Sequence, residues 1–85
     1  MRYYKMYSES LEGQEGEFFC EIDDNGLLVR QIQVFGNKLY WATDDEEFDD
    51  SYPIGDQPEF NPKEYDCQEI SVDLFEKTWQ KSLNQ

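Results

Sequence analysis

The side chains of this sequence that could do chemistry are mostly carboxylates, and they are densest between positions 44 and 50. Carboxylates can transfer protons, hold a hard cation or dock against a basic surface. The rest of the sequence decides which of these uses is expected. The run contains one aromatic residue, Phe48, among six acids: Asp44, Asp45, Glu46, Glu47, Asp49 and Asp50.

Catalysis is disfavoured by the residue types and motifs that the sequence lacks. The chain has no histidine, no Ser, Thr or Cys in a glycine-flanked elbow, and no glycine-rich phosphate loop ahead of a helix. Two carboxylates can divide acid and base roles only in a cleft that separates their pKa values, and a small domain has little room for one. We therefore expect a non-enzymatic protein with no catalytic residues and no cofactor.

A dedicated metal site is not expected either. Calcium takes six to eight oxygen ligands, and the acidic run lacks the alternating acids, the glycine and the closing glutamate of an EF-hand loop. Asp23–Gly26 looks like a fragment of such a loop, but the Leu-Leu-Val that follows supplies no ligands. Cys20 and Cys67 have no His or second Cys at a metal-binding spacing. Whether these two cysteines pair with each other stays open.

The net charge of the chain points to its partners. Twenty Asp and Glu against seven Lys and Arg give a formal charge of −13. Such a field repels nucleic acid and anionic membranes, and it attracts basic proteins by steering that weakens with salt. The simpler alternative is that the charge serves solubility alone.

Aromatic side chains interleave with the acids in this part of the chain, at Phe48, Tyr52 and Phe60. Interface centres favour aromatic anchors, and a carboxylate rim speeds encounter with a basic partner. The alternative role of these rings is to pin the segment to the body of the domain. With Phe48 or Tyr52 as the buried anchor, the expected partner-binding residues are Asp44, Asp45, Glu46, Glu47, Phe48, Asp49, Asp50 and Tyr52.

The elements that must position this segment begin with an antiparallel meander. Asn25-Gly26 favours a type I′ hairpin, in which both central residues have positive φ, and Gly36-Asn37 favours a second tight turn. The first predicted strand pairs with the second because sequential strands are usually neighbours. Four strands are predicted from alternating patterns, at residues 2–8, 17–23, 27–35 and 38–43.

The alternation within these strands predicts which side chains form the core. In the second strand Phe18, Cys20 and Ile22 share one face, and only Phe19 breaks the pattern. Arg30 falls among apolar positions, so it is expected to reach the sheet edge or to pair with a carboxylate such as Glu21.

Residues 70–85 predict a C-terminal helix. Ser71 suits the N-cap, Asp73 complements the positive end of the helix dipole, and Lys81 lies toward the negative end. Apolar residues recur on one face at Val72, Phe75, Trp79 and Leu83.

These patterns predict an α+β fold in one domain, residues 1–85. It comprises a four-stranded antiparallel β-sheet (residues 1–43), a long acidic, proline-containing loop (44–69) and one C-terminal α-helix (70–85) that packs on the sheet. Helix residues Phe75 and Trp79 are expected to meet sheet residues Cys20, Ile22, Ile32 and Val34.

The sequence shows no signal peptide and no transmembrane run, so the expected location is the cytoplasm. The order of Arg2–Lys5, Glu21–Asp23, Val29–Phe35 and Glu69–Phe75, with Trp79, resembles a family of short, acidic bacterial proteins classed as a domain of unknown function. That resemblance implies one bacterial domain. It brings no activity, substrate or catalytic residue with it.

Three hypotheses of function follow. The first is an inhibitor, in the manner of a toxin-neutralising immunity protein, that masks the basic active site of a nuclease-like toxin. The second is a DNA mimic or anti-defence protein of phage or mobile-element origin that occupies a DNA-binding protein. The third is an accessory domain whose charge serves only solubility. Direct contact with nucleic acid or membrane is not expected in any of them.

Overall fold

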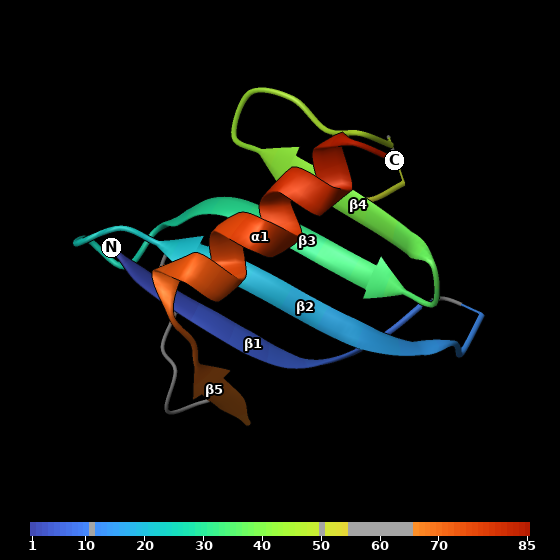
Figure 1. Ribbon diagram of the computed structural model, residues 1–85, viewed down its shortest axis with the longest axis horizontal. Helices are drawn as coiled ribbons and strands as arrows, with labels where there is room; N and C mark the ends of the chain where they lie inside the picture. Colours follow the sequence, from blue (N-terminus) through green and yellow to red (C-terminus); the bar gives the residue numbers. More distant parts are fainter. Residues whose placement is uncertain (11, 50, 55–65) are drawn as a thin grey trace.

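The computed structural model of this chain describes residues 1–10, 12–49, 51–54 and 66–85. In this part the fold is α+β, with one antiparallel sheet and one C-terminal helix across it (Figure 1). The strand order is β4-β3-β2-β1-β5. The elements are β1 (Arg2–Glu9), β2 (Glu15–Ile22), β3 (Leu28–Phe35), β4 (Lys38–Thr43), β5 (Cys67–Glu69) and α1 (Val72–Leu83).

The described sheet has five strands, so the prediction of four was wrong. Strands β1 to β4 form the predicted meander, and β5 adds to the outer edge of β1 by pairing Cys67–Glu69 with Tyr4–Met6. The Ile70 N–H donates to the Tyr3 carbonyl at 2.8 Å and continues this pairing. Three residues are too few to show a strand period in the sequence, and β5 exists because β1 presents an open edge to it.

Both short hairpin connections form, but the first turn differs from its prediction. Only Gly26 of the Asn25-Gly26 pair has positive φ, at 81°, so the turn is not type I′. The Asp23 side chain explains the difference, because its Oδ1 accepts the N–H groups of Asn25 and Leu27 at 2.8 and 2.9 Å. In the second connection, Gly36 has a φ of 61° and links β3 to β4 through two residues.

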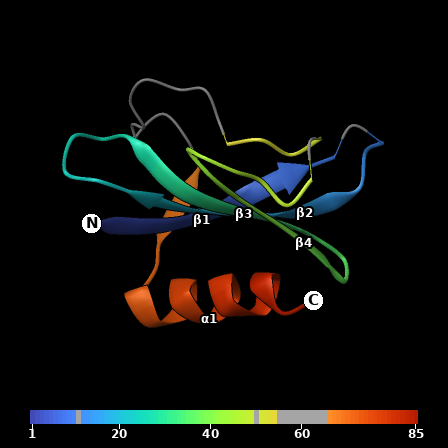
Figure 2. The ribbon, with the colours of Figure 1, turned by 90° about the horizontal axis from the view of Figure 1, so that it is seen from above.

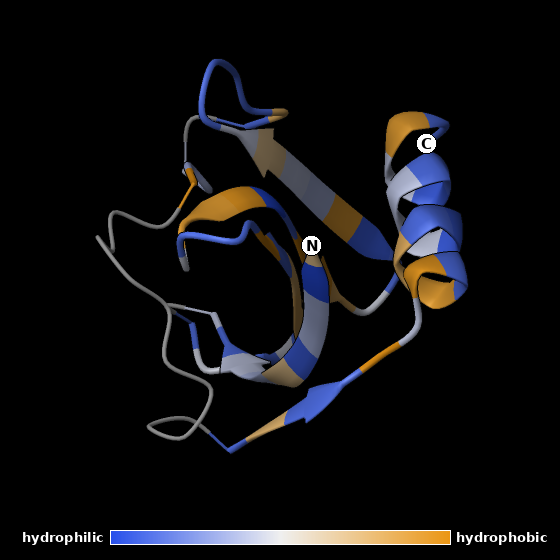
Figure 3. Ribbon diagram, turned by 90° about the vertical axis from the view of Figure 1, so that its left-hand side faces the viewer, coloured by the Kyte–Doolittle hydropathy of each residue, from blue (hydrophilic) through white to orange (hydrophobic). Residues whose placement is uncertain are grey.

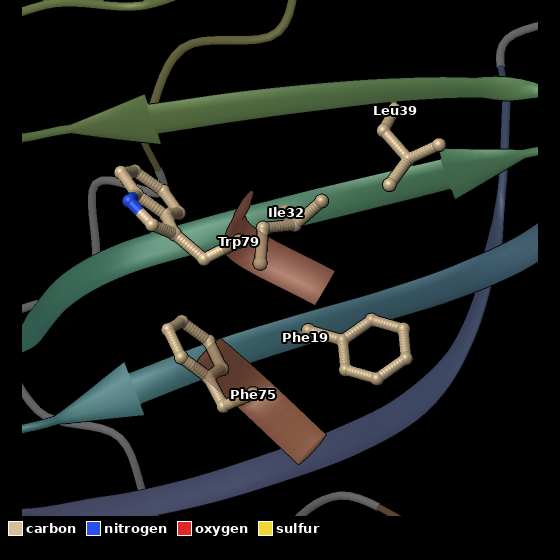
Figure 4. Packing of buried hydrophobic residues seen from close by; sticks show 5 residues of the cluster. All are labelled: Phe19, Ile32, Leu39, Phe75 and Trp79. Atoms are coloured by element: carbon tan, nitrogen blue, oxygen red, sulfur yellow. The ribbon is translucent and has the colours of Figure 1, made fainter. Parts of the chain in front are cut away.

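The core between helix and sheet uses the opposite face of β2 from the predicted one. Cys20 and Ile22 pack with Tyr4 on the other side of the sheet. Phe19 pairs with Ile32, and Ile32 pairs with Trp41. Because directly paired residues share a face, this register turns Phe19 toward the helix. Ile32 and Val34 face the helix as predicted. Five buried side chains form the centre of this core, and Figure 4 shows them: Phe19, Ile32, Leu39, Phe75 and Trp79.

The other face of the sheet is also packed. Helix α1 lies along one side, and residues 51–54 cross the opposite side (yellow in Figure 2). The Gln31 side chain, 1% exposed, donates to the Pro53 carbonyl at 2.8 Å. Because apolar residues are needed on both faces, the strands of this sheet give no single clean alternation.

The helix begins where the sequence predicts. Ser71 is the N-cap, and its hydroxyl accepts the Leu74 N–H at 3.2 Å. The buried face is narrower than the predicted stripe, because it comprises Phe75, Trp79 and Ser82. The two outer members of the stripe, Val72 and Leu83, are exposed.

Candidate functional site

The acidic turn, residues 44–49, follows β4 and folds back along the edge of that strand. The Thr43 N–H donates to the Glu46 carbonyl at 2.8 Å. The Thr43 hydroxyl accepts the N–H groups of Asp45 and Glu46 at 3.2 and 3.1 Å. Glu47 then forms a bridge with Ala42. These bonds use backbone groups of Asp45, Glu46 and Glu47, so they leave the carboxylates of these three residues unused.

Among the described residues, the carboxylates of the acidic turn have no cationic partner. Asp44, Asp45, Glu46 and Glu47 are exposed. Asp49 is half-buried, and its Oδ1 accepts the Ser51 N–H at 2.9 Å. None of the ion pairs between described residues involves a member of the turn. Figure 3 shows the turn beyond the end of β4 as a mostly hydrophilic projection. The predicted site residue Asp50 lies outside the described residues.

Phe48 is the exposed aromatic residue of this surface. Its side chain is 46% exposed, while its N–H donates to the Trp41 carbonyl at 3.0 Å. The Phe48 ring lies 6.2 Å from the Tyr40 ring and 6.4 Å from the Trp41 ring, measured between centroids. Because Tyr40 and Trp41 point to opposite faces of β4, Phe48 covers the edge of the strand and stays accessible.

Tyr52, the other predicted anchor, packs against the sheet. Its ring stacks on Tyr40 with centroids 3.9 Å apart and lies 5.8 Å from Phe35. Loss of water contact raises the pKa of the Tyr52 hydroxyl, and Tyr40, Glu12 and Asp49 act in the same direction. Tyr52 therefore fixes the segment to the sheet, and Glu12 from the β1–β2 connection comes close enough for its charge to act on the Tyr52 hydroxyl. Sequence spacing gave no signal for that approach.

The backbone edge of β4 is capped, which the sequence analysis missed. The Leu39 N–H donates to Gln85 Oε1 at 3.0 Å, and the Gln85 side-chain amide donates back to the Leu39 carbonyl. Farther along the strand, the bonds of Trp41 to Phe48 and of Thr43 to Glu46 occupy the same edge. The Leu39 N–H and carbonyl, the Trp41 carbonyl and the Thr43 N–H are thus already bonded, so a partner at this surface meets mainly side chains.

An arginine site inside the molecule combines carboxylates with aromatic rings. Arg30 donates through Nε to Glu21 Oε1 at 2.7 Å and through Nη2 to Glu21 Oε2 at 2.9 Å, and it also pairs with Glu76. Its guanidinium carbon lies 4.9 Å from the Phe75 centroid and 4.8 Å from the Trp79 centroid. The expected pairing of Arg30 with Glu21 is confirmed. This site ties β2 and β3 to α1.

The two cysteines do not form a disulfide with each other. Cys20 is buried and Cys67 is partly buried. Strand β1 lies between their strands, so two strand spacings of about 4.8 Å each separate the backbones, which is more than a disulfide spans. Burial raises the pKa of the Cys20 thiol to about 12, so it carries no thiolate near neutral pH. Within the described part of the chain, no three His, Cys, Asp or Glu side chains are grouped to hold a metal ion.

Comparisons with protein-family models, with curated proteins and with solved structures find no match to this chain. The resemblance to short, acidic bacterial proteins therefore stays a prediction. The class that the structure defines is an α+β protein with an antiparallel sheet and one C-terminal helix. Its only described helix, α1, is too short and too polar to cross a bilayer.

Proposed function

We propose that this protein acts without catalysis, by binding and masking a basic surface of another protein. One observation carries the proposal: Phe48 is held on the edge of β4 by its backbone and stays 46% exposed beside four exposed carboxylates that have no described ion-pair partner. A desolvated aromatic ring can anchor an interface, and the surrounding charges complement a basic partner.

The charges and the ring have different tasks in such an interface. Carboxylates at the rim attract a basic partner over several ångströms and speed its encounter. An aromatic side chain that loses its water on binding slows dissociation. Proteins that hold nucleic-acid phosphates carry basic surfaces of this kind, so a nuclease-like toxin or a DNA-binding protein has the required chemistry.

A neutralised variant tests the proposal. Asp44→Asn, Asp45→Asn, Glu46→Gln and Glu47→Gln together remove four charges, and no described hydrogen bond uses these four side chains, so the fold should persist. Affinity capture from lysate at low and high salt supplies the partner, and surface plasmon resonance measures its association rate. We expect association to slow by about tenfold at low salt, with a smaller effect on dissociation.

A control variant removes four charges elsewhere. Glu15, Asp24, Asp66 and Glu69 are exposed and lie outside the acidic turn, so Glu15→Gln, Asp24→Asn, Asp66→Asn and Glu69→Gln give the same net charge. The control should slow association much less, because rim charges act most strongly near the contact. Equal slowing by both variants would show that only the total charge matters and that the turn is not the site.

A further inference from the structure

The acidic turn offers two chemical groups that this protein already uses to bind a cation. Inside the fold, Arg30 lies within 5 Å of two aromatic centroids while a carboxylate accepts two of its N–H groups. On the surface, the exposed Phe48 ring lies next to Tyr40 and Trp41, and the carboxylates before it have no described cation. The Arg30 site therefore contains its cation, whereas the described residues supply none to the acidic turn.

We infer that the acidic turn recognises an arginine side chain on the basic partner in preference to lysine; this inference rests on the proposed function. A guanidinium is planar and weakly hydrated, so it can stack on Phe48 and donate in parallel to a carboxylate. A lysine ammonium is a compact and strongly hydrated point charge, and it gains less from the ring. The aromatic ring is therefore the group that distinguishes the two cations.

The capped edge of β4 limits how a partner can bind at the acidic turn. Gln85 occupies both outward backbone groups of Leu39, and Phe48 and Glu46 bond to the next two outward residues. An added β-strand would need these same groups. The partner therefore presents its arginine as a side chain, and it adds no strand at the edge of β4.

Two labelled peptides, (Gly-Arg)4 and (Gly-Lys)4, test the inference with equal charge and spacing. Fluorescence anisotropy at low salt measures their dissociation constants for the whole protein. We expect the arginine peptide to bind about two- to fivefold more tightly, as an exposed cation–π contact would give. Phe48→Leu should remove this preference by weakening the arginine peptide more than the lysine peptide, because leucine keeps the apolar bulk and has no π face. Tyr7→Leu is the control, since Tyr7 is 61% exposed on β1.

The outcomes separate this inference from the proposed function. Equal affinity for both peptides, or an arginine preference that survives Phe48→Leu, overturns the inference. The two peptides could bind equally to the native protein and not at all to the four-charge variant of the turn. In that case the acidic turn still binds basic partners, and the proposed function stands. If that variant binds both peptides as the native protein does, the turn is not the docking surface and both proposals fail. Circular dichroism of each variant confirms that it is folded.

Discussion

Arg30 is the side chain that joins the two layers of this fold. Its guanidinium binds Glu21 on β2 and Glu76 on α1, and it lies against two rings of the helix. Glu21 is 4% exposed and also accepts the Tyr3 hydroxyl at 2.9 Å. The hydrogen bonds from Arg30 hold the pKa of the Glu21 carboxyl below its usual range, despite the opposing effect of burial. Folding therefore favours the ionised carboxylate.

The lowered pKa of Glu21 predicts acid sensitivity. A carboxyl whose pKa is lower in the folded state stabilises the fold above its unfolded pKa of about 4.3, and this contribution is lost as pH falls through the folded pKa. Glu21→Gln should lower the unfolding free energy by about 1.5–3 kcal/mol at pH 7. The difference between native protein and variant should shrink at pH 3, because this pH lies below the unfolded pKa and the contribution of the carboxylate is already being lost there. Urea unfolding at the two pH values measures it.

Glu15→Gln serves as the control for this titration, since Glu15 is an exposed residue at the start of the same strand. It should change the unfolding free energy little at either pH. A Glu21→Gln effect of the same size at pH 7 and pH 3 would mean that the carboxylate charge contributes nothing.

Strand β2 is packed on both faces, and this determines the effect of mutations along it. Phe19 is 6% exposed and belongs to the helix-facing core, whereas Phe18 is only partly buried at the margin of the second cluster. Gly16, near the start of the strand, lies under the Phe35 ring. A Cβ added at Gly16 would come within 2.5 Å of that ring and 2.1 Å of the Val34 carbonyl oxygen. The strand therefore tolerates little change in side-chain volume.

The orientation of β2 predicts which of its two phenylalanines contributes more to stability. Phe19→Ala should lower the unfolding free energy by about 3–5 kcal/mol, because it leaves a cavity against Ile32 and Phe75. Phe18→Ala should cost clearly less, since part of that ring already meets solvent. Chemical unfolding of the two variants under the same conditions measures the difference. The reverse order would place Phe18 in the core and contradict the register of β2.

The cap on β4 can be removed through a single side chain. Gln85→Ala deletes the donor and acceptor that hold the Leu39 backbone, so the Leu39 amide should exchange with solvent at least tenfold faster. The Tyr40 amide is the internal control, because alternate residues of an edge strand point inward and Tyr40 pairs with Gln33. Hydrogen exchange followed by NMR resolves both. Unchanged protection at Leu39 would show that the cap does not form in solution.

At the scale of the whole molecule, the formal charge of −13 sets the response to ions. Added salt screens the repulsion between carboxylates and should raise the melting temperature. At a calcium concentration about a hundred times its Kd, a dedicated site would add about 2.7 kcal/mol to the unfolding free energy. That would raise the melting temperature by roughly 10–20 °C in a domain of this size. We expect millimolar calcium to raise the melting temperature no more than monovalent salt of equal ionic strength. Calorimetry that shows saturable, stoichiometric binding in the micromolar range would contradict this.

The elements with strong local signals could be predicted from the sequence. Ser71 and the spacing of Phe75 and Trp79 fixed the helix, because capping and helical periodicity act within a few residues. Alternating patterns and the two glycine turns fixed the meander of β1 to β4, and Arg30 was matched with Glu21 across one hairpin. For the candidate site, the sequence indicated where acids and aromatic residues concentrate.

Features that depend on residues far apart in the chain became visible only in the folded structure. Strand β5 forms against β1 more than 60 positions away, and Gln85 caps Leu39 across 46. The core face of β2 follows from register, because Phe18 and Phe19 are both apolar and local alternation cannot choose between them. Phe48 is exposed and Tyr52 packs on Tyr40, and this difference also depends on contacts that the local sequence does not show. Local sequence records short-range preferences, whereas burial is decided by residues that only folding brings together.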